Sequence, residues 1–287
     1  MKNFPSKKKI QTILKPKKKK LIVNLNADGG IFDFKKVSNF AKNYLKTYYS
    51  QHPTNDELAV IEFLVRHYPK VKKNSRMIEI GCGPTIHHIL PACEYISEIH
   101  MADYLEENLR EIQLWKQKHK KAHNWNRFTE LSLRHEGIES KIEDVLSREN
   151  KLRQKITKFL KCDLKKDFPL GKHRTYQVVG AFYCTEEVGT NQREWKKVMS
   201  RVAKLVSPGG HLFIASLRAT KYYSASVLDG VRLNLPAAYL TEKDFYKVLP
   251  TLEFDMSQTV IETKKIRGQK EEGIHSVILV SALKYKK

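Results

Sequence analysis

Short apolar segments alternate with amphipathic ones over about 200 residues of this chain, which limits the fold class sharply. YQVVGAFYC is apolar throughout, as expected of a strand buried on both faces of a sheet. FDMSQTVIE and HSVILVSAL resemble an antiparallel closing pair. We predict an α/β fold: a Rossmann-like, doubly wound, mainly parallel sheet with an antiparallel final strand. The strand-like segments are RMIEIG (76–81), EIHMAD (98–103), KITKFLKCD (155–163), YQVVGAFYC (176–184), HLFIASL (211–217), FDMSQTVIE (254–262) and HSVILVSAL (275–283).

Helical patterns fill the intervals between these strands. PTIHHILPACEYIS (84–97) fits one helix despite Pro91 near its end, and the helix in REWKKVMSRVAKLVSPGG should end at Pro208 and the two glycines. Residues 124–155 are polar and helix-prone, and LEENLREIQLWKQKH carries one apolar face.

Two helices are expected upstream, between residues 36 and 70. In the second, Thr54 and Glu57 have the spacing of a capping box. We therefore divide the chain into a basic leader (1–35) and a single domain (36–287), made of a helical N-terminal part (36–70) and an α/β core (71–287).

The net charge of +22 raises the question of a nucleic-acid partner. The first 20 residues hold nine lysines and no acid, and such a lysine-rich stretch with two prolines is typical of a solvated, mobile tail. The remaining charge is spread over helix faces. We therefore expect no nucleic-acid partner.

The same sequence predicts a cytoplasmic monomer that does not span a membrane. No apolar stretch reaches the length of a membrane span, and the N-terminus lacks the apolar centre of a secretory signal. The four cysteines form neither a C-x-x-C pair nor a zinc-type spacing, which is typical of reduced thiols inside the cell.

Candidate ligand-binding residues follow consecutive predicted strands, where ligands bind in a sheet of this kind. Gly81-Cys82-Gly83 follows the first strand, Asp103 the second, and Asp163 the third. The glycines let a ligand approach the main chain, and a carboxylate after the second strand can accept from two ribose hydroxyls. Together they favour an adenosine-containing cofactor over a purely structural turn.

S-adenosylmethionine suits this pattern best. A dinucleotide fingerprint needs a third glycine where Ile86 stands, and no P-loop lysine follows the turn. A metal site is not expected, because adjacent His87 and His88 would diverge by about 100° on a helix and no further ligand follows at a recognisable spacing.

The motifs IEIGCGPTIHHILPACE and MADYLEENLREIQLW resemble those of the nicotinamide, phenylethanolamine and indolethylamine N-methyltransferases. NYLKTYYS, LKCDL, LVSPGGHLFI, KYYSAS and LNLP extend the resemblance over about residues 40 to 285, without the leader. It implies a class I methyltransferase with an N-terminal lid, which transfers a methyl group from S-adenosylmethionine to a nitrogen of a small amine or heteroaromatic acceptor.

By this resemblance, Tyr44 and Tyr49 belong to the lid that closes over the cofactor. Gly81 and Gly83 would pass under the methionine portion, with Thr85 nearby.

The resemblance places the nucleoside on the following strands. Asp103 would hold the ribose, with Tyr104 beside the adenosine and Asn108 at the polar end of the cofactor. Asp163 and Leu164 would flank the adenine.

The acceptor side is implied in the same way. Glu186 or Glu187 matches the acid with which the phenylethanolamine enzyme holds its amine, and a one-residue ambiguity in the alignment leaves both open. Tyr223 would line the acceptor pocket with Tyr49, and Asn234 in LNLP is a further candidate. The carboxylate would orient the amine and accept its proton, while aromatic faces would stabilise positive charge.

Three positions depart from the family pattern. His87 stands where relatives carry a tyrosine that touches the cofactor, and Ala181 replaces a small hydroxyl residue. Ser216 replaces the aspartate with which the nicotinamide enzyme binds its substrate, so nicotinamide is disfavoured as the acceptor. Two other functions stay open: a nucleic-acid methyltransferase and a non-catalytic module that binds S-adenosylmethionine. FYCTEEV after the fourth strand lacks the turn that holds a flipped base, which disfavours the first of these.

Overall fold

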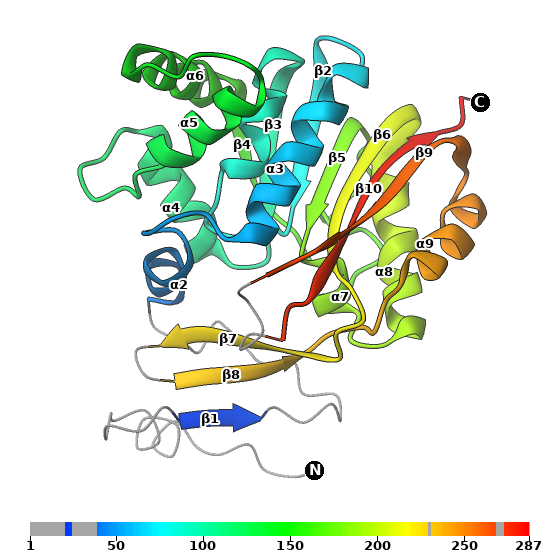
Figure 1. Ribbon diagram of the computed structural model, residues 1–287. Coiled ribbons are helices and arrows are strands. Elements are labelled where there is room, and N and C mark those ends of the chain that lie inside the picture. The colour runs from blue at the N-terminus through cyan, green and yellow to red at the C-terminus, as the bar shows by residue number, and fades with distance from the viewer. Residues whose placement is uncertain (1–20, 25–38, 229–230, 268–272, 287) are drawn as a thin grey trace.

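A mainly parallel sheet forms the centre of the protein (Figure 1). The computed structural model describes residues 21–24, 39–228, 231–267 and 273–286. The strand order of this sheet is β4-β3-β2-β5-β6-β10-β9, with β10 antiparallel to β6 and β9 antiparallel to β10. The predicted fold class is confirmed. The strands are β2 (Ser75–Ile80), β3 (Ile96–Asp103), β4 (Ile156–Lys161), β5 (Tyr176–Phe182), β6 (Val206–Leu217), β9 (Phe254–Lys265) and β10 (Ser276–Lys284).

Both faces of this sheet are covered by helices. Successive strand residues point to opposite faces, so Met77 belongs to one apolar layer and Ile78 to the other. The first layer includes residues of α3 and α5, and the second includes residues of α8 and α9. The helices are α2 (Phe40–Tyr48), α3 (Asn55–His67), α4 (Glu106–Lys116), α5 (Asn126–His135), α6 (Ile142–Lys155), α7 (Thr185–Val188), α8 (Gln192–Leu205) and α9 (Glu242–Val248).

A second, smaller sheet lies beside α2, as Figure 1 shows. Its order is β1-β8-β7, in which β1 (Leu21–Asn24) runs parallel to β8 (Val231–Pro236) and β8 runs antiparallel to β7 (Tyr222–Leu228). Strand β1 lies within the predicted leader, and the rest of the leader lies outside the described residues. Within the described ranges, no helix combines the length and apolar character needed to cross a bilayer.

Two expectations about helices are wrong. Residues 84–97 do not form one α-helix but two 3₁₀ turns, η3 (His87–Ile89) and η4 (Pro91–Glu94). Pro91 has no N–H to donate to the carbonyl of His87, so the hydrogen bonds of an α-helix cannot continue through it. Helix α8 ends at Leu205, before Pro208, because β6 already begins at Val206.

Candidate functional site

A cavity of about 510 Å³ lies at the carboxyl ends of the central parallel strands. Parallel strands bring their carboxyl ends to one edge, so the segments that follow β2, β3, β4 and β5 all reach the cavity. The lid helix α2 supplies further walls, and so do residues of α3 and β7. The predicted site residues that line this cavity are Tyr44, Tyr49, Gly81, Gly83, Thr85, Asp103, Tyr104, Asn108, Asp163, Leu164, Glu187 and Tyr223.

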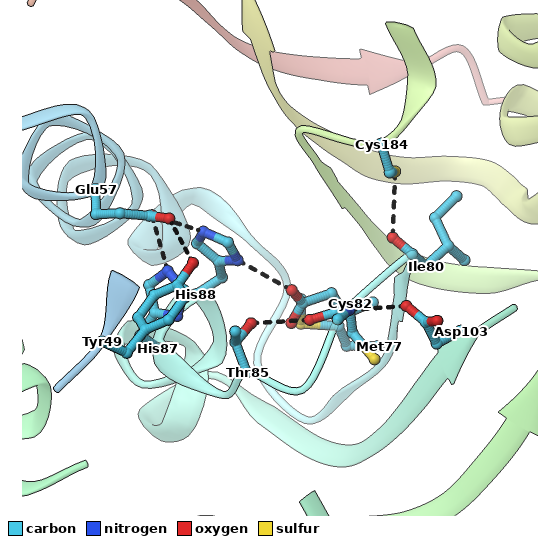
Figure 2. Close-up of polar contacts among 12 residues, drawn as sticks. Tyr49, Glu57, Met77, Ile80, Cys82, Thr85, His87, His88, Asp103 and Cys184 are labelled. Atoms are coloured by element: carbon cyan, nitrogen blue, oxygen red, sulfur yellow. Dashed lines mark hydrogen bonds and ion pairs between the residues drawn. The ribbon is translucent and has the colours of Figure 1, made fainter. Parts of the chain in front are cut away.

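The turn after β2 requires its two glycines. Gly81 and Gly83 have φ angles of 60° and 59°, in the left-handed region that favours glycine. A Cβ on Gly81 would also lie 2.6 Å from Cβ of Cys184. The backbone N–H of Gly83 donates to Oδ2 of Asp103 at 2.8 Å, and the Thr85 hydroxyl donates to the Cys82 carbonyl at 2.8 Å (Figure 2). The turn is therefore fixed before any ligand binds.

Asp103 connects this turn to the next strand. Its Oδ1 accepts from the backbone N–H of Leu105 at 2.8 Å and from Nδ2 of Asn108 at 3.0 Å. Burial raises the pKa of Asp103, although these hydrogen bonds oppose the rise. Oδ1 of Asn108 is buried and has no hydrogen-bond partner among the described residues. An acceptor left without a donor in a cavity wall is suited to a hydroxyl or amine of a ligand.

These residues fit the adenosine and methionine parts of S-adenosylmethionine. Glycines, a ribose-type carboxylate and an open amide oxygen surround one end of the cavity, with Asp163 following β4. Among the described lining residues, the basic side chains are Lys165 and His88. So few cations suit a sulfonium cofactor better than the pyrophosphate of a dinucleotide.

An aromatic cluster covers the cavity from the lid. The ring of Tyr44 lies 5.8 Å from that of Phe40, 5.0 Å from that of Tyr48 and 5.7 Å from that of Tyr49, between centroids. Tyr49 also packs on Trp125 at 5.3 Å, which joins the lid to the region before α5. Rings at these distances exclude water and present electron-rich faces to a cation.

Glu57 does not form the predicted capping box with Thr54, whose side chain makes no cap hydrogen bond. Its carboxylate instead turns toward Tyr49, His87 and His88 (Figure 2), and Glu57 is one of the residues that line the cavity. Oε1 accepts from the hydroxyl of Tyr49 at 2.9 Å, while Oε2 lies 2.8 Å from Nε2 of His87 and 3.1 Å from Nε2 of His88. Three side chains thus share one buried carboxylate.

The expectation that the two histidines diverge is wrong. Because they lie in a 3₁₀ turn, both rings reach Glu57, and their centroids are 3.8 Å apart. One nitrogen of each ring and one oxygen of Glu57 lie within 4.8 Å of one another, as metal ligands would. Two imidazoles bound to one tetrahedral ion would hold their centroids about 5 Å apart, so this closer geometry suits a shared hydrogen-bond acceptor better.

The electrostatics of the cluster differ from residue to residue. Burial raises the pKa of Glu57, but the two imidazoles outweigh it and hold that pKa well below its usual range. Burial also opposes charge on His88, yet Glu57 and Glu79 raise its pKa to about 9. Burial lowers the pKa of His87 to about 4. His88 is therefore the charged imidazole at neutral pH, and it also lines the cavity, whereas the sequence singled out His87.

The two acids after β5 have different surroundings, which removes the ambiguity between them. Glu187 lines the cavity and is hydrogen-bonded to Tyr223, while burial and the nearby charge of Glu186 raise its pKa to about 8. Glu186 faces away, and its Oε1 accepts from the backbone N–H of Leu217 at 2.8 Å. Burial raises the pKa of Glu186 to about 7. Glu187 can reach a ligand, whereas Glu186 ties the end of β6 to α7.

Five predicted site residues lie outside the lining of the cavity. Ala181 and Ser216 are fully buried inside β5 and β6, before the carboxyl ends of these strands reach the cavity. The complete set is His87, Ala181, Glu186, Ser216 and Asn234.

Tyr183 is a lining residue that sequence reasoning missed. It follows β5 directly and has a φ of 52°, which is uncommon for a residue with a Cβ. Its hydroxyl is buried without a hydrogen-bond partner among the described residues. Strained backbone and unsatisfied polar groups concentrate at functional sites, and no pattern in the sequence signals either. Other unforeseen lining residues include Tyr48, Asp56, Glu57 and His88.

Comparison with known proteins agrees with this geometry. The sequence profile of the NNMT/PNMT/TEMT family matches residues 33–284. Indolethylamine N-methyltransferase of Mus musculus is 32% identical over 191 residues, which cover 63% of this chain and 71% of that protein. Nicotinamide N-methyltransferase of Homo sapiens is 29% identical over 63% of this chain and 71% of its own length. Phenylethanolamine N-methyltransferase of Mus musculus is 31% identical over 52% of this chain and 51% of its own length.

Solved structures share the fold at lower sequence identity. Magnesium protoporphyrin IX methyltransferase from Synechocystis, with bound S-adenosylmethionine, has a TM-score of 0.52 at 14% identity and covers 90% of this chain and 99% of its own. The complex of DhpI with S-adenosylhomocysteine has a TM-score of 0.51 at 11% identity, over 86% of this chain and 94% of its own. At such identities the likeness supports the fold alone.

Proposed function

The chain belongs to the NNMT/PNMT/TEMT family, and on that premise we propose that it transfers a methyl group from S-adenosylmethionine to the nitrogen of a small amine held by Glu187. One observation carries the choice of acceptor. Glu187 is a half-buried carboxyl group in the wall of the same cavity that holds the glycine turn and Asp103. A carboxyl group in a cavity wall, without a permanent cationic partner among the described residues, is suited to a ligand that brings its own positive charge.

The cofactor would be held by groups that already have fixed positions. Asp103 is oriented by its three hydrogen bonds and offers its remaining lone pairs to ribose hydroxyls, while Oδ1 of Asn108 offers another acceptor. Asp163 and Leu164 would flank the base beyond β4. When bound, S-adenosylmethionine supplies an electrophilic methyl group on a sulfonium sulfur.

Glu187 and Tyr223 would orient the acceptor. The Tyr223 hydroxyl is hydrogen-bonded to Glu187, so the carboxylate is held toward the cavity. An amine has to lose a proton in the course of the transfer. A carboxyl group whose pKa of about 8 lies close to neutral pH exchanges a proton readily, and its ionised form can accept the proton of the amine.

The rest of the cavity wall would position the reactants and exclude water. Tyr44, Tyr48 and Tyr49 close one side, and their ring faces attract a sulfonium or an ammonium group. Methyl transfer in line between two held atoms needs alignment more than it needs acid or base strength. A closed aromatic wall supplies that alignment and removes competing water.

A labelled-methyl assay over a panel of amines, pyridines, thiols and phenols tests the proposal. We expect turnover of amines that are cationic at neutral pH, and loss of that preference in Glu187→Gln. Glu186→Gln is the matched control, because Glu186 adjoins Glu187 in sequence yet faces Leu217. If wild type methylates none of the amines, or if Glu187→Gln keeps the preference for cations, the acceptor assignment is wrong.

We also propose that the protein is cytoplasmic and monomeric. The four cysteines are all free and buried, which supports a reducing, cytoplasmic environment. Size-exclusion chromatography coupled to light scattering would test the expectation of a monomer, and a dimer peak at micromolar concentration would contradict it.

A further inference from the structure

We propose that Glu57 and His88 form a positioning pair that fixes the lid residue Tyr49 against the cofactor turn, so that their ionic interaction controls closure of the cavity. The inference rests on the proposed function, because the cavity is taken to hold the methyl donor. It goes beyond that function by assigning a role to two residues of the cavity wall that need not touch the reacting atoms.

The first step of the argument is the attachment of the lid. Tyr49 directly follows α2, and its hydroxyl donates to Oε1 of Glu57 at 2.9 Å. Glu57 lies in the first turn of α3, which packs on the main sheet. A hydrogen bond to a charged group is stronger than one between neutral groups. The end of the lid is therefore tied to the main domain through one carboxylate (Figure 2).

The second step is the link from Glu57 to the cofactor turn. His88 comes three residues after Thr85, the last residue of the turn that lines the cavity. Its Nε2 lies 3.1 Å from Oε2 of Glu57, and its Nδ1 lies 3.0 Å from Oε1 of Glu79 on β2. His88 thus bridges carboxylates from α3 and β2, and the chain of contacts runs from the lid to the strand under the glycine turn.

The third step concerns charge. Tyr49, Glu57, His88 and Glu79 are all buried. Loss of the His88 charge therefore leaves Glu57 without the charged imidazole that it faces, whereas loss of the Glu57 charge leaves Glu79 as the remaining carboxylate partner of His88. His88 has a pKa raised to about 9 by its carboxylate partners, so its stabilising charge is present at neutral pH and is lost as pH rises through about 9. Loss of that charge would weaken the hold on Glu57 and, through it, on Tyr49.

The surroundings of His88 contain few other titratable groups. Phe182 packs on its ring at a centroid distance of 4.2 Å, and the hydroxyl of Tyr68 lies 3.4 Å from its carbonyl oxygen. The titratable groups that interact with the pair in the described part of the chain are Glu79, His87, Tyr44, Tyr49, Tyr68 and Tyr183. Burial holds the tyrosine pKa values well above the usual range and that of His87 at about 4, so His88 dominates titration near pH 9.

Calorimetry tests the pair by measuring how tightly S-adenosylmethionine binds to four variants, with thermal unfolding measured in parallel. The variants are Tyr49→Phe, Glu57→Gln, His88→Gln and the double variant Glu57→Gln/His88→Gln. We expect Glu57→Gln to weaken cofactor binding about tenfold at neutral pH. Adding Tyr49→Phe to it should weaken binding little further, because the charge that strengthens the Tyr49 hydrogen bond is already lost. The double variant should unfold at a higher temperature than His88→Gln, because Glu57 is then no longer a buried charge without its partner.

The pH dependence separates positioning from plain stability. Wild type should bind the cofactor less tightly as pH rises through about 9, whereas the neutral double variant should show no such change. His100→Gln is the matched control: His100 is buried and lies 2.9 Å from Glu98, but outside the cavity. It should lower the unfolding temperature and leave cofactor affinity unchanged.

Two results would overturn the proposal. In the first, Glu57→Gln and His88→Gln lower the unfolding temperature but keep the cofactor affinity and pH profile of wild type, so the pair is only structural. In the second, Tyr49→Phe binds the cofactor as tightly as wild type does. This variant keeps both charges of the pair, so it still tests the proposal if the other variants do not fold. Failure of the proposed function looks different: cofactor binds, responds to these variants as described, and no amine is methylated.

Discussion

Replacement of Glu187 by glutamine should flatten the dependence of stability on pH. Burial and Glu186 raise the pKa of Glu187 from 4.5 to about 8. A carboxyl group whose pKa is higher in the folded chain than in the unfolded chain stabilises the fold at low pH, and this contribution is lost as pH rises through the folded pKa. Each pKa unit corresponds to about 1.4 kcal/mol. Between about pH 6 and pH 9 the group should therefore cost wild type about 2–3 kcal/mol of stability.

Urea unfolding at both pH values measures this difference directly. Glu187→Gln has no proton to lose at this position. Between about pH 6 and pH 9, its free energy of unfolding should therefore fall by about 2–3 kcal/mol less than that of wild type. Part of the slope should remain, because Glu186 keeps a raised pKa of its own. Glu143→Gln makes the same chemical change on the surface and should keep the slope of wild type. Equal slopes in wild type and Glu187→Gln would refute the reasoning that desolvation and Glu186 raise the pKa of Glu187 in the folded chain.

Three further changes test other parts of the cavity. Asp103→Asn should weaken the binding of S-adenosylmethionine at least tenfold in calorimetry, because it removes the charge that accepts hydrogen bonds from the ribose. Binding as tight as that of wild type would show that Asp103 does not hold the cofactor. Gly81→Ala should lower the unfolding temperature far more than Gly171→Ala, since both have positive φ but only the first would clash with Cys184; equal losses would contradict the close packing of this turn. Tyr183→Phe should leave the unfolding temperature unchanged or higher, because its hydroxyl has no partner to lose among the described residues, and a clear decrease would show that a partner exists.

The main sheet and the cofactor turn could be predicted because they follow from local patterns. Apolar runs of strand length and the glycines between them place Gly81, Gly83, Asp103 and Asp163 at one edge of a parallel sheet, and the structure brings these residues together. No distant contact has to be known for that inference.

Glu57 shows why the rest could not be predicted. Its spacing from Thr54 fits a capping box, but its partners are His87 and His88, about thirty positions along the chain, and a local pattern contains no sign of them. The two histidines converge because residues 84–97 form two 3₁₀ turns rather than one helix. Tertiary contacts overrode the local preference of Glu57, whereas Pro91 is itself a local signal against a continuous helix.

The left-handed backbone of Tyr183 has a consequence for engineering. Glycine or asparagine would relieve the conformational strain at this position, by about 1 kcal/mol, and would remove a buried hydroxyl that lacks a partner among the described residues. The same replacement would delete an aromatic ring that packs against the apolar core and lines the cavity, and loss of such a ring costs about 3 kcal/mol or more. Phenylalanine removes the hydroxyl and keeps the ring, so a laboratory selection for heat resistance should favour it over glycine. A screen for durable catalysts at this position has to score turnover in the same round as survival.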